Sequence, residues 1–73
     1  MNNNNSKISV VCPTYNSEKY IEKAIVSLLY QDVKPDEVIF SDDGSKDETV
    51  SIIEKYQIPF EKKGIAFKII INT

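Results

Sequence analysis

Two adjacent carboxylates stand where an apolar segment of the chain ends. Asp42 and Asp43 follow the apolar residues 38–40 after a single serine, and they precede Gly44 and Ser45. In an open α/β sheet, ligands bind just beyond the carboxyl ends of the strands, which is where such a segment would place both acids. Neighbouring carboxylates repel each other, so each must be solvated, hydrogen-bonded within the fold or used in a functional site. This pair is the first candidate for a functional site.

A second polar loop follows an earlier apolar run. Residues 8–12 are rich in β-branched side chains, and Pro13, Thr14, Tyr15 and Asn16 come next. If the two apolar runs are neighbouring parallel strands, both loops leave the same edge of the sheet. Together they offer a ring for stacking, a carboxylate for N–H and O–H groups, and the amides of helix starts. Those parts suit a nucleotide.

Two plainer interpretations compete with this one. Residues 42–45 have the composition of a tight turn, because Asp, Gly and Ser are common turn residues. Tyr15 has the features of a packing residue at the end of a strand. Side chains alternate along a strand, so Asp42 and Asp43 should point to opposite sides, one toward a ligand and the other into the loop. Taken alone, the residues leave these alternatives open.

Composition excludes several kinds of site. The chain has no histidine and one cysteine, Cys12, which rules out zinc sites, Ser-His-Asp or Cys-His triads and an internal disulfide. Cys12 lies in an apolar run, so we expect a core residue in a reducing compartment. The only glycines, Gly44 and Gly64, cannot form a dinucleotide fingerprint or a P-loop. A net charge of −2 argues against nucleic acid as a partner.

The chain also lacks the features of a membrane or secreted protein. No apolar run approaches the about 20 residues of a membrane span. Residues 1–6 have neither a basic nor an apolar region, so we expect a short disordered lead and no signal peptide. The length of 73 residues allows one small domain of marginal stability.

Alternating strands and helices must position the two loops. Residues 8–12 form a strand that Pro13 ends, and Asn16 or Ser17 then caps a helix. Pro35 breaks that helix before a second strand at residues 37–41. The helical stripe consists of Ile21, Ala24, Ile25, Leu28 and Leu29.

The rest of the chain repeats this alternation. Ser45 and Glu48 have the capping-box spacing, which predicts a helix through Val50, Ile53 and Tyr56. Residues 57–64 are a connector, and residues 65–71 form a third strand. The expected fold is α/β: a β-α-β-α-β unit with three parallel strands, the second between the others. The first strand is apolar enough to be covered on both faces, yet one of its edges would be bare. We infer that this chain is the opening portion of something longer, or that a partner completes its sheet.

Three segments in order resemble a known family. Residues 10–16 (VVCPTYN), 24–31 (AIVSLLYQ) and 37–49 (EVIFSDDGSKDET) are similar to the start of the family 2 glycosyltransferases, inverting enzymes of the GT-A fold. The similarity covers residues 7 to 56 and extends toward the last strand. The GT-A fold is the Rossmann-like fold of nucleotide-diphospho-sugar transferases. The resemblance implies that residues 7–73 are its N-terminal, nucleotide-binding portion and that this portion is incomplete.

The resemblance also implies roles for single residues. Pro13 and Tyr15 would lie against the uracil or thymine base of a nucleotide-sugar, and Asp43 would accept a hydrogen bond from that base. Asp42 and Ser45 would shape the loop. The implied nucleotide-binding set is Pro13, Thr14, Tyr15, Asp42 and Asp43, supported by Asn16 and Ser45, with Asn16 alternatively only a helix cap.

The family's remaining machinery is absent from this sequence. Family members hold Mg²⁺ or Mn²⁺ with a later Asp-x-Asp element and use a further acid as general base, whereas this chain has no Asp-x-Asp. We therefore assign no catalytic residue or metal ligand here and expect the chain alone to be inactive.

The resemblance implies a parent enzyme of definite type. It would transfer a sugar from a UDP-linked donor, with inversion, to a glycan or lipid-linked glycan in polysaccharide biosynthesis. The expected location is the cytoplasm, including the inner face of the membrane. The alternatives are a stand-alone small nucleotide-binding module or a truncated product without function.

Overall fold

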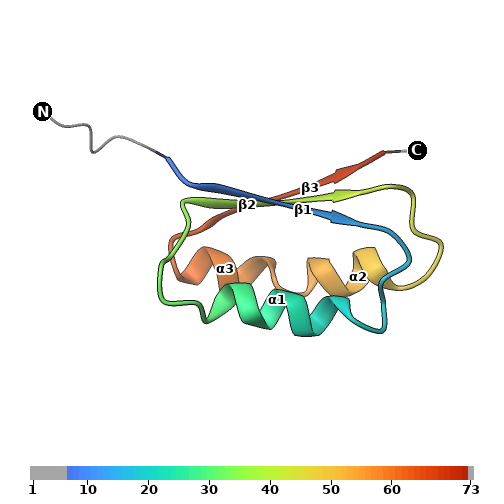
Figure 1. The fold of residues 1–73 in the computed structure, drawn as a ribbon, viewed down its shortest axis with the longest axis horizontal. Coiled ribbons are helices and arrows are strands. Elements are labelled where there is room, and N and C mark those ends of the chain that lie inside the picture. The colour runs from blue at the N-terminus through green and yellow to red at the C-terminus, as the bar shows by residue number, and fades with distance from the viewer. Residues whose placement is uncertain (1–6, 73) are drawn as a thin grey trace, which may run out of the picture.

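Three parallel strands form one sheet, and all the helices lie on one of its faces (Figure 1). The computed structural model describes residues 7–72, so the predicted disordered lead lies outside the described residues. The elements in chain order are β1 (Ser9–Thr14), α1 (Ile21–Leu29), β2 (Glu37–Asp42), α2 (Thr49–Glu54), α3 (Gln57–Lys62) and β3 (Ala66–Ile71). The strand order β1-β2-β3 confirms the predicted α/β fold with the second strand in the middle.

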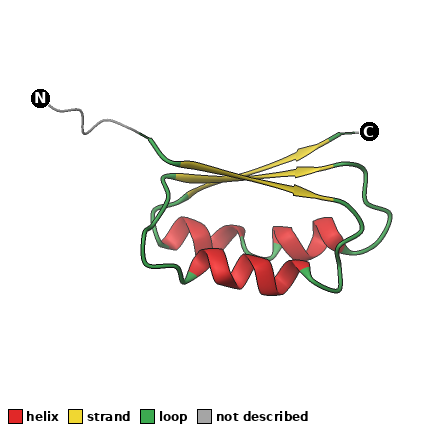
Figure 2. Ribbon diagram, in the orientation of Figure 1, coloured by secondary structure: helices red, strands yellow, loops and turns green. Residues whose placement is uncertain are grey.

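The register of the strands brings their carboxyl ends to one edge of the sheet. Thr14 at the end of β1 pairs with Asp42 at the end of β2, and Asp42 pairs with Ile71 at the end of β3. Both strand-to-helix loops leave from this edge, as Figure 2 shows in green. The fold therefore places the loops that carry the candidate residues next to each other.

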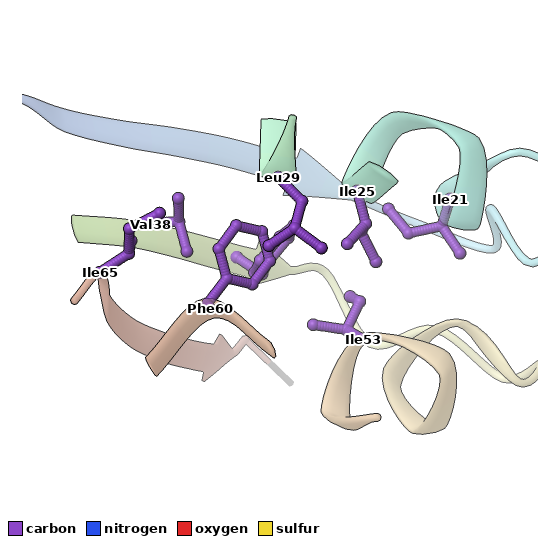
Figure 3. Packing of buried hydrophobic residues seen from close by; sticks show 8 residues of the cluster. Ile21, Ile25, Leu29, Val38, Ile53, Phe60 and Ile65 are labelled. Carbon is purple, nitrogen blue, oxygen red and sulfur yellow. The ribbon is translucent and has the colours of Figure 1, made fainter. Parts of the chain in front are cut away.

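The hydrophobic core lies between the sheet and the helices. From α1, the buried stripe is Ile21, Ile25 and Leu29, which meets side chains from the other elements (Figure 3). The remaining core residues are Val38, Phe40, Ile53, Phe60 and Ile65. The stripe predicted for α1 is confirmed except at Ala24, which is exposed. The i, i+4 positions face the sheet, and Leu28 packs at the margin of the core.

The first strand extends further than predicted. Pro13 lies inside β1 and pairs with Ser41, so the prediction that Pro13 ends the strand was wrong. Proline is accepted in an edge strand because its missing N–H can face away from the neighbouring strand. Thr14 thereby joins the sheet and comes to lie opposite Asp42.

The predicted connector at residues 57–64 was wrong, because Gln57–Lys62 form α3. Pro59 lies in the first turn of α3, where the backbone N–H groups have no partner inside the helix, so its ring and missing N–H are tolerated. Phe60 is fully buried, with its ring centroid 6.4 Å from that of Phe40 and 5.8 Å from that of Phe67. Burial of this ring stabilises a helix that the local sequence does not indicate.

The sheet is covered on one face only within the described part of the chain. Val10 on β1 packs against the core, whereas the next residue, Val11, has 59% of its surface exposed. The expectation that β1 is covered on both faces is therefore wrong for residues 7–72. None of the helices in this range is long and apolar enough to cross a membrane.

Candidate functional site

The first loop (residues 15–20) and the second loop (residues 43–48) leave β1 and β2 side by side at the carboxyl edge of the sheet (Figure 1). Hydrogen bonds join them directly. The backbone N–H of Glu48 donates to Oε1 of Glu18 at 2.8 Å, and the backbone N–H of Ser17 donates at 2.7 Å to Oγ1 of Thr49, the first residue of α2. The two loops therefore form one surface.

Asp42 is fully buried beneath this surface. Its Oδ1 accepts hydrogen bonds from the hydroxyls of Thr14 and Ser45, both at 2.6 Å, and its Oδ2 accepts one from the Ser45 backbone N–H at 2.7 Å. Burial alone would raise the pKa of Asp42, but the hydrogen bonds from Ser45 and Thr14 outweigh it and hold the pKa below its usual value. Asp42 is thus an ionised carboxylate that ties the end of β1 to the second loop.

Asp43 lies in the opposite environment. Its side chain is exposed, as the alternation of side chains along a strand predicts. Its backbone N–H donates to the Thr14 carbonyl at 3.0 Å, which continues the β1–β2 pairing by one residue. The Asp43 carboxylate therefore stands at the sheet edge, where it can accept a hydrogen bond from a ligand.

The first loop presents aromatic and apolar surface beside that carboxylate. Tyr15 is 56% exposed and Pro13 is exposed as well. Thr14, between them, is buried against Asp42. The hydroxyl of Ser17 donates to the Tyr15 carbonyl at 3.0 Å, which stabilises the turn that follows the ring.

The side-chain caps predicted for α1 were wrong. The helix begins at Ile21, and neither Asn16 nor Ser17 caps it with a side chain. Instead the Ser17 carbonyl accepts the backbone N–H groups of Tyr20 and Ile21, both at 2.8 Å. Asn16 takes the left-handed conformation (φ 44°) and bonds to the second loop.

The capping box predicted for α2 was also wrong. The helix begins at Thr49, whose backbone N–H donates to Oδ1 of Asp47 at 2.9 Å. Desolvation would raise the pKa of Asp47, but hydrogen bonds from Thr49 outweigh it and lower that pKa. Ser45, the predicted cap, instead bonds to the buried Asp42, and Glu48 accepts a hydrogen bond from Ser51.

Asn72, just after β3, joins the site although no sequence pattern pointed to it. Its Nδ2 donates to Oγ of Ser41 at 3.0 Å and to Oδ1 of Asp43 at 3.3 Å, and its backbone N–H donates to the Asp42 carbonyl at 2.7 Å. A Cβ atom on Gly44 (φ 81°) would lie 3.3 Å from the Asn72 carbonyl oxygen, so this close approach favours glycine there. Only the predicted strand order could have indicated Asn72, because it places the end of β3 beside β2.

The described residues do not fit a divalent metal ion. Residues 7–72 contain no grouping of three or more His, Cys, Asp or Glu side chains that could hold one. Both carboxylate oxygens of Asp42 already accept hydrogen bonds within the fold. A role for Mg²⁺ or Mn²⁺ stays a prediction.

Comparison with known proteins finds relatives of one kind. The chain is 47% identical over 51 residues to the GalNAc(5)-diNAcBac-PP-undecaprenol beta-1,3-glucosyltransferase of Campylobacter jejuni, which covers 70% of this chain and 16% of that protein. It is 51% identical over 53 residues to the poly(ribitol-phosphate) beta-N-acetylglucosaminyltransferase TarS of Staphylococcus aureus, covering 70% of this chain and 9% of TarS.

The structural comparison agrees with these relatives. The crystal structure of S. aureus TarS 1-349 superposes with a TM-score of 0.71 and 42% identity over 90% of this chain, which is 19% of that chain. The sheet and helices are thus the start of a GT-A fold. The chain spans only 9% to 19% of the lengths of these relatives. Residues 9–73 match the model of the family described as Glycosyl transferase family 2, and the chain belongs to that family.

Proposed function

We propose that the chain forms the nucleotide-binding part of a glycosyltransferase that moves a sugar from a UDP-linked donor to an acceptor hydroxyl with inversion. The observation that carries the proposal is the placement of exposed Asp43 and Tyr15 on hydrogen-bonded neighbouring loops at the carboxyl edge of a parallel sheet. Nucleotides bind at this edge in open α/β folds. The family membership supports the sugar-transfer part.

Each candidate residue has a role that its position allows. The Asp43 carboxylate accepts a hydrogen bond from the N–H group of the uracil base, and Pro13 and Tyr15 lie against the base. Thr14 and Asp42 are buried, so they act on the nucleotide through the loop that they hold in place.

The chain alone binds the donor nucleotide without transferring the sugar. It contains no Asp-x-Asp, and we assign it no general base. Without these groups, the charge on the leaving diphosphate is not compensated and the acceptor hydroxyl is not activated. The complete enzyme uses Mg²⁺ or Mn²⁺ and a glycan or lipid-linked glycan acceptor, and it works in the cytoplasm or at the inner face of the membrane. A relative whose name includes an undecaprenol-linked glycan supports this class of acceptor.

Titration calorimetry of the 73-residue chain with UDP tests the proposal. Asp43→Ala should weaken UDP binding by about tenfold or more, the effect of losing a hydrogen bond to a charged group. Circular dichroism should show an unchanged fold, because the Asp43 side chain is exposed. Asp32→Ala removes another exposed carboxylate and serves as the matched control.

Other nucleotides complete the experiment. GDP and CDP should bind more weakly than UDP, because their bases present different hydrogen-bonding groups to Asp43. Equal UDP binding by Asp43→Ala and the unsubstituted chain would show that Asp43 does not read the base. No binding of UDP by the unsubstituted chain would overturn the proposed function for this chain.

A further inference from the structure

We propose that Asn16 is a positioning residue that fastens the first loop to the second and so sets the distance between Tyr15 and Asp43. This inference rests on the proposed function, because those two side chains are the groups proposed to bind the base. Asn16 immediately follows Tyr15, and its partners begin two residues after Asp43.

Two hydrogen bonds of opposite direction carry the inference. The backbone N–H of Asn16 donates to Oγ of Ser45 at 2.8 Å, and the backbone N–H of Lys46 donates to Oδ1 of Asn16, also at 2.8 Å. The same Ser45 hydroxyl donates to the buried carboxylate of Asp42 at 2.6 Å. Asn16 is therefore linked through the Ser45 hydroxyl to the buried carboxylate of Asp42 at the end of β2.

The backbone of Asn16 supports the same role. Among the described residues it is the only non-glycine with a positive φ, 44°. Asparagine adopts this left-handed conformation more readily than most residues, but the conformation still has a cost that the surrounding contacts must offset. Here the contacts that offset it are those to Ser45 and Lys46, so conformation and loop contact depend on each other.

The remaining contacts between the loops allow this role to be tested without unfolding the chain. Closer to the two helix starts, the Ser17 backbone N–H donates to the Thr49 hydroxyl, and the Glu48 backbone N–H donates to the Glu18 carboxylate. These bonds do not involve Asn16, so the loops stay attached when its side chain is removed. The local geometry around Tyr15 and Asp43 is what should change.

Two substitutions separate the side chain from the backbone. Asn16→Gly permits the left-handed conformation and keeps the N–H donated to Ser45, but it removes the acceptor for Lys46. We expect its UDP affinity to fall about tenfold, with little change in the unfolding midpoint. Asn16→Asp keeps an oxygen acceptor for the Lys46 N–H and should restore most of the affinity. Lys19→Ala, an exposed change in the same loop, is the control.

Hydrogen exchange gives a second readout that needs no nucleotide. The Lys46 amide should exchange faster in Asn16→Gly and should regain protection in Asn16→Asp. Normal UDP affinity in Asn16→Gly would overturn the inference and leave the proposed function standing, as would unchanged Lys46 exchange. If the unsubstituted chain does not bind UDP, the proposed function fails, and the role of Asn16 in nucleotide binding fails with it.

Discussion

At the scale of single residues, two carboxylates adjacent in sequence have opposite environments. Asp42 is fully buried and its oxygens accept hydrogen bonds from Thr14 and Ser45, whereas Asp43 is exposed. An ionised group can be buried only when hydrogen bonds replace its lost hydration. The Asp-Asp pair is therefore stable because one acid is bonded inside the fold and the other is hydrated.

Asp42 should make the stability of the chain depend on pH. Its pKa in the folded state lies below the ordinary value of 3.8. The stabilisation from its ionised form is therefore complete above that ordinary value and is lost as the pH falls through the lower, folded pKa. At neutral pH, Asp42→Asn should cost about 2–3 kcal/mol, because an amide N–H₂ group then faces donors of Ser45 or Thr14.

Urea unfolding followed by circular dichroism at several acidic and neutral pH values measures this effect. The variant should lose less stability than the parent when the pH is lowered, since it has no carboxylate at this position to protonate. Asp32→Asn, an exposed change, should leave the pH dependence unaltered. The same acid dependence in Asp42→Asn as in the parent would contradict the assignment of Asp42 as the responsible group.

At the scale of elements, sequence patterns predicted the helices and strands that are determined by their local sequence. The stripe of Ile21, Ile25 and Leu29 identified α1, and three short apolar runs identified the strands and their order. The missed helix, α3, contains Pro59 and follows a break after α2. It depends on burial of Phe60 between helix and sheet, a tertiary contact with no local pattern.

The site was predictable to a similar degree. The two loops and their neighbouring positions followed from the strand order, because parallel strands end at one edge. The start of α2 did not follow, because the Ser45 hydroxyl is bonded to the buried Asp42, and Glu48, the residue before the helix, makes no side-chain cap. Asn72 carries no motif, and its contact with Asp43 depends on the register between β2 and β3.

The dependence of α3 on one ring leads to a prediction for that element. Phe60→Ala should cost about 3–5 kcal/mol, since the side chain is fully buried and packs against Phe40 and Phe67. Ile58→Ala in the same helix should change stability by about 0.5 kcal/mol or less, because Ile58 is 63% exposed. Urea denaturation gives both values.

A chain of this size has little stability to lose, so a further variant is needed. Phe60→Leu keeps an apolar side chain at the site and should fold with an intermediate loss of stability. If Phe60→Ala and Ile58→Ala are equally stable, α3 is not anchored by Phe60.

At the scale of the whole molecule, the chain has two layers, one sheet and one layer of helices (Figure 1). Parallel sheets are usually covered on both faces, and here the face away from the helices carries Val11, Ile39 and Ile70 among polar residues. Val11 is 59% exposed and Ile70 is 47% exposed. The apolar side chains of this face contribute little to the stability of the chain by itself.

Substitutions at two adjacent valines on β1 test whether only one face of the sheet is covered. Val10 packs against the core and Val11 points to the uncovered face. Val10→Lys should cost several kcal/mol, because it places a charge against the core, whereas Val11→Lys should cost about 1 kcal/mol or less. Chemical denaturation combined with sedimentation at several protein concentrations measures stability and association together. A large loss for both variants would mean that Val11 is covered in solution. A sedimenting mass above that of one chain that falls to one chain in Val11→Lys would identify a second copy as the cover.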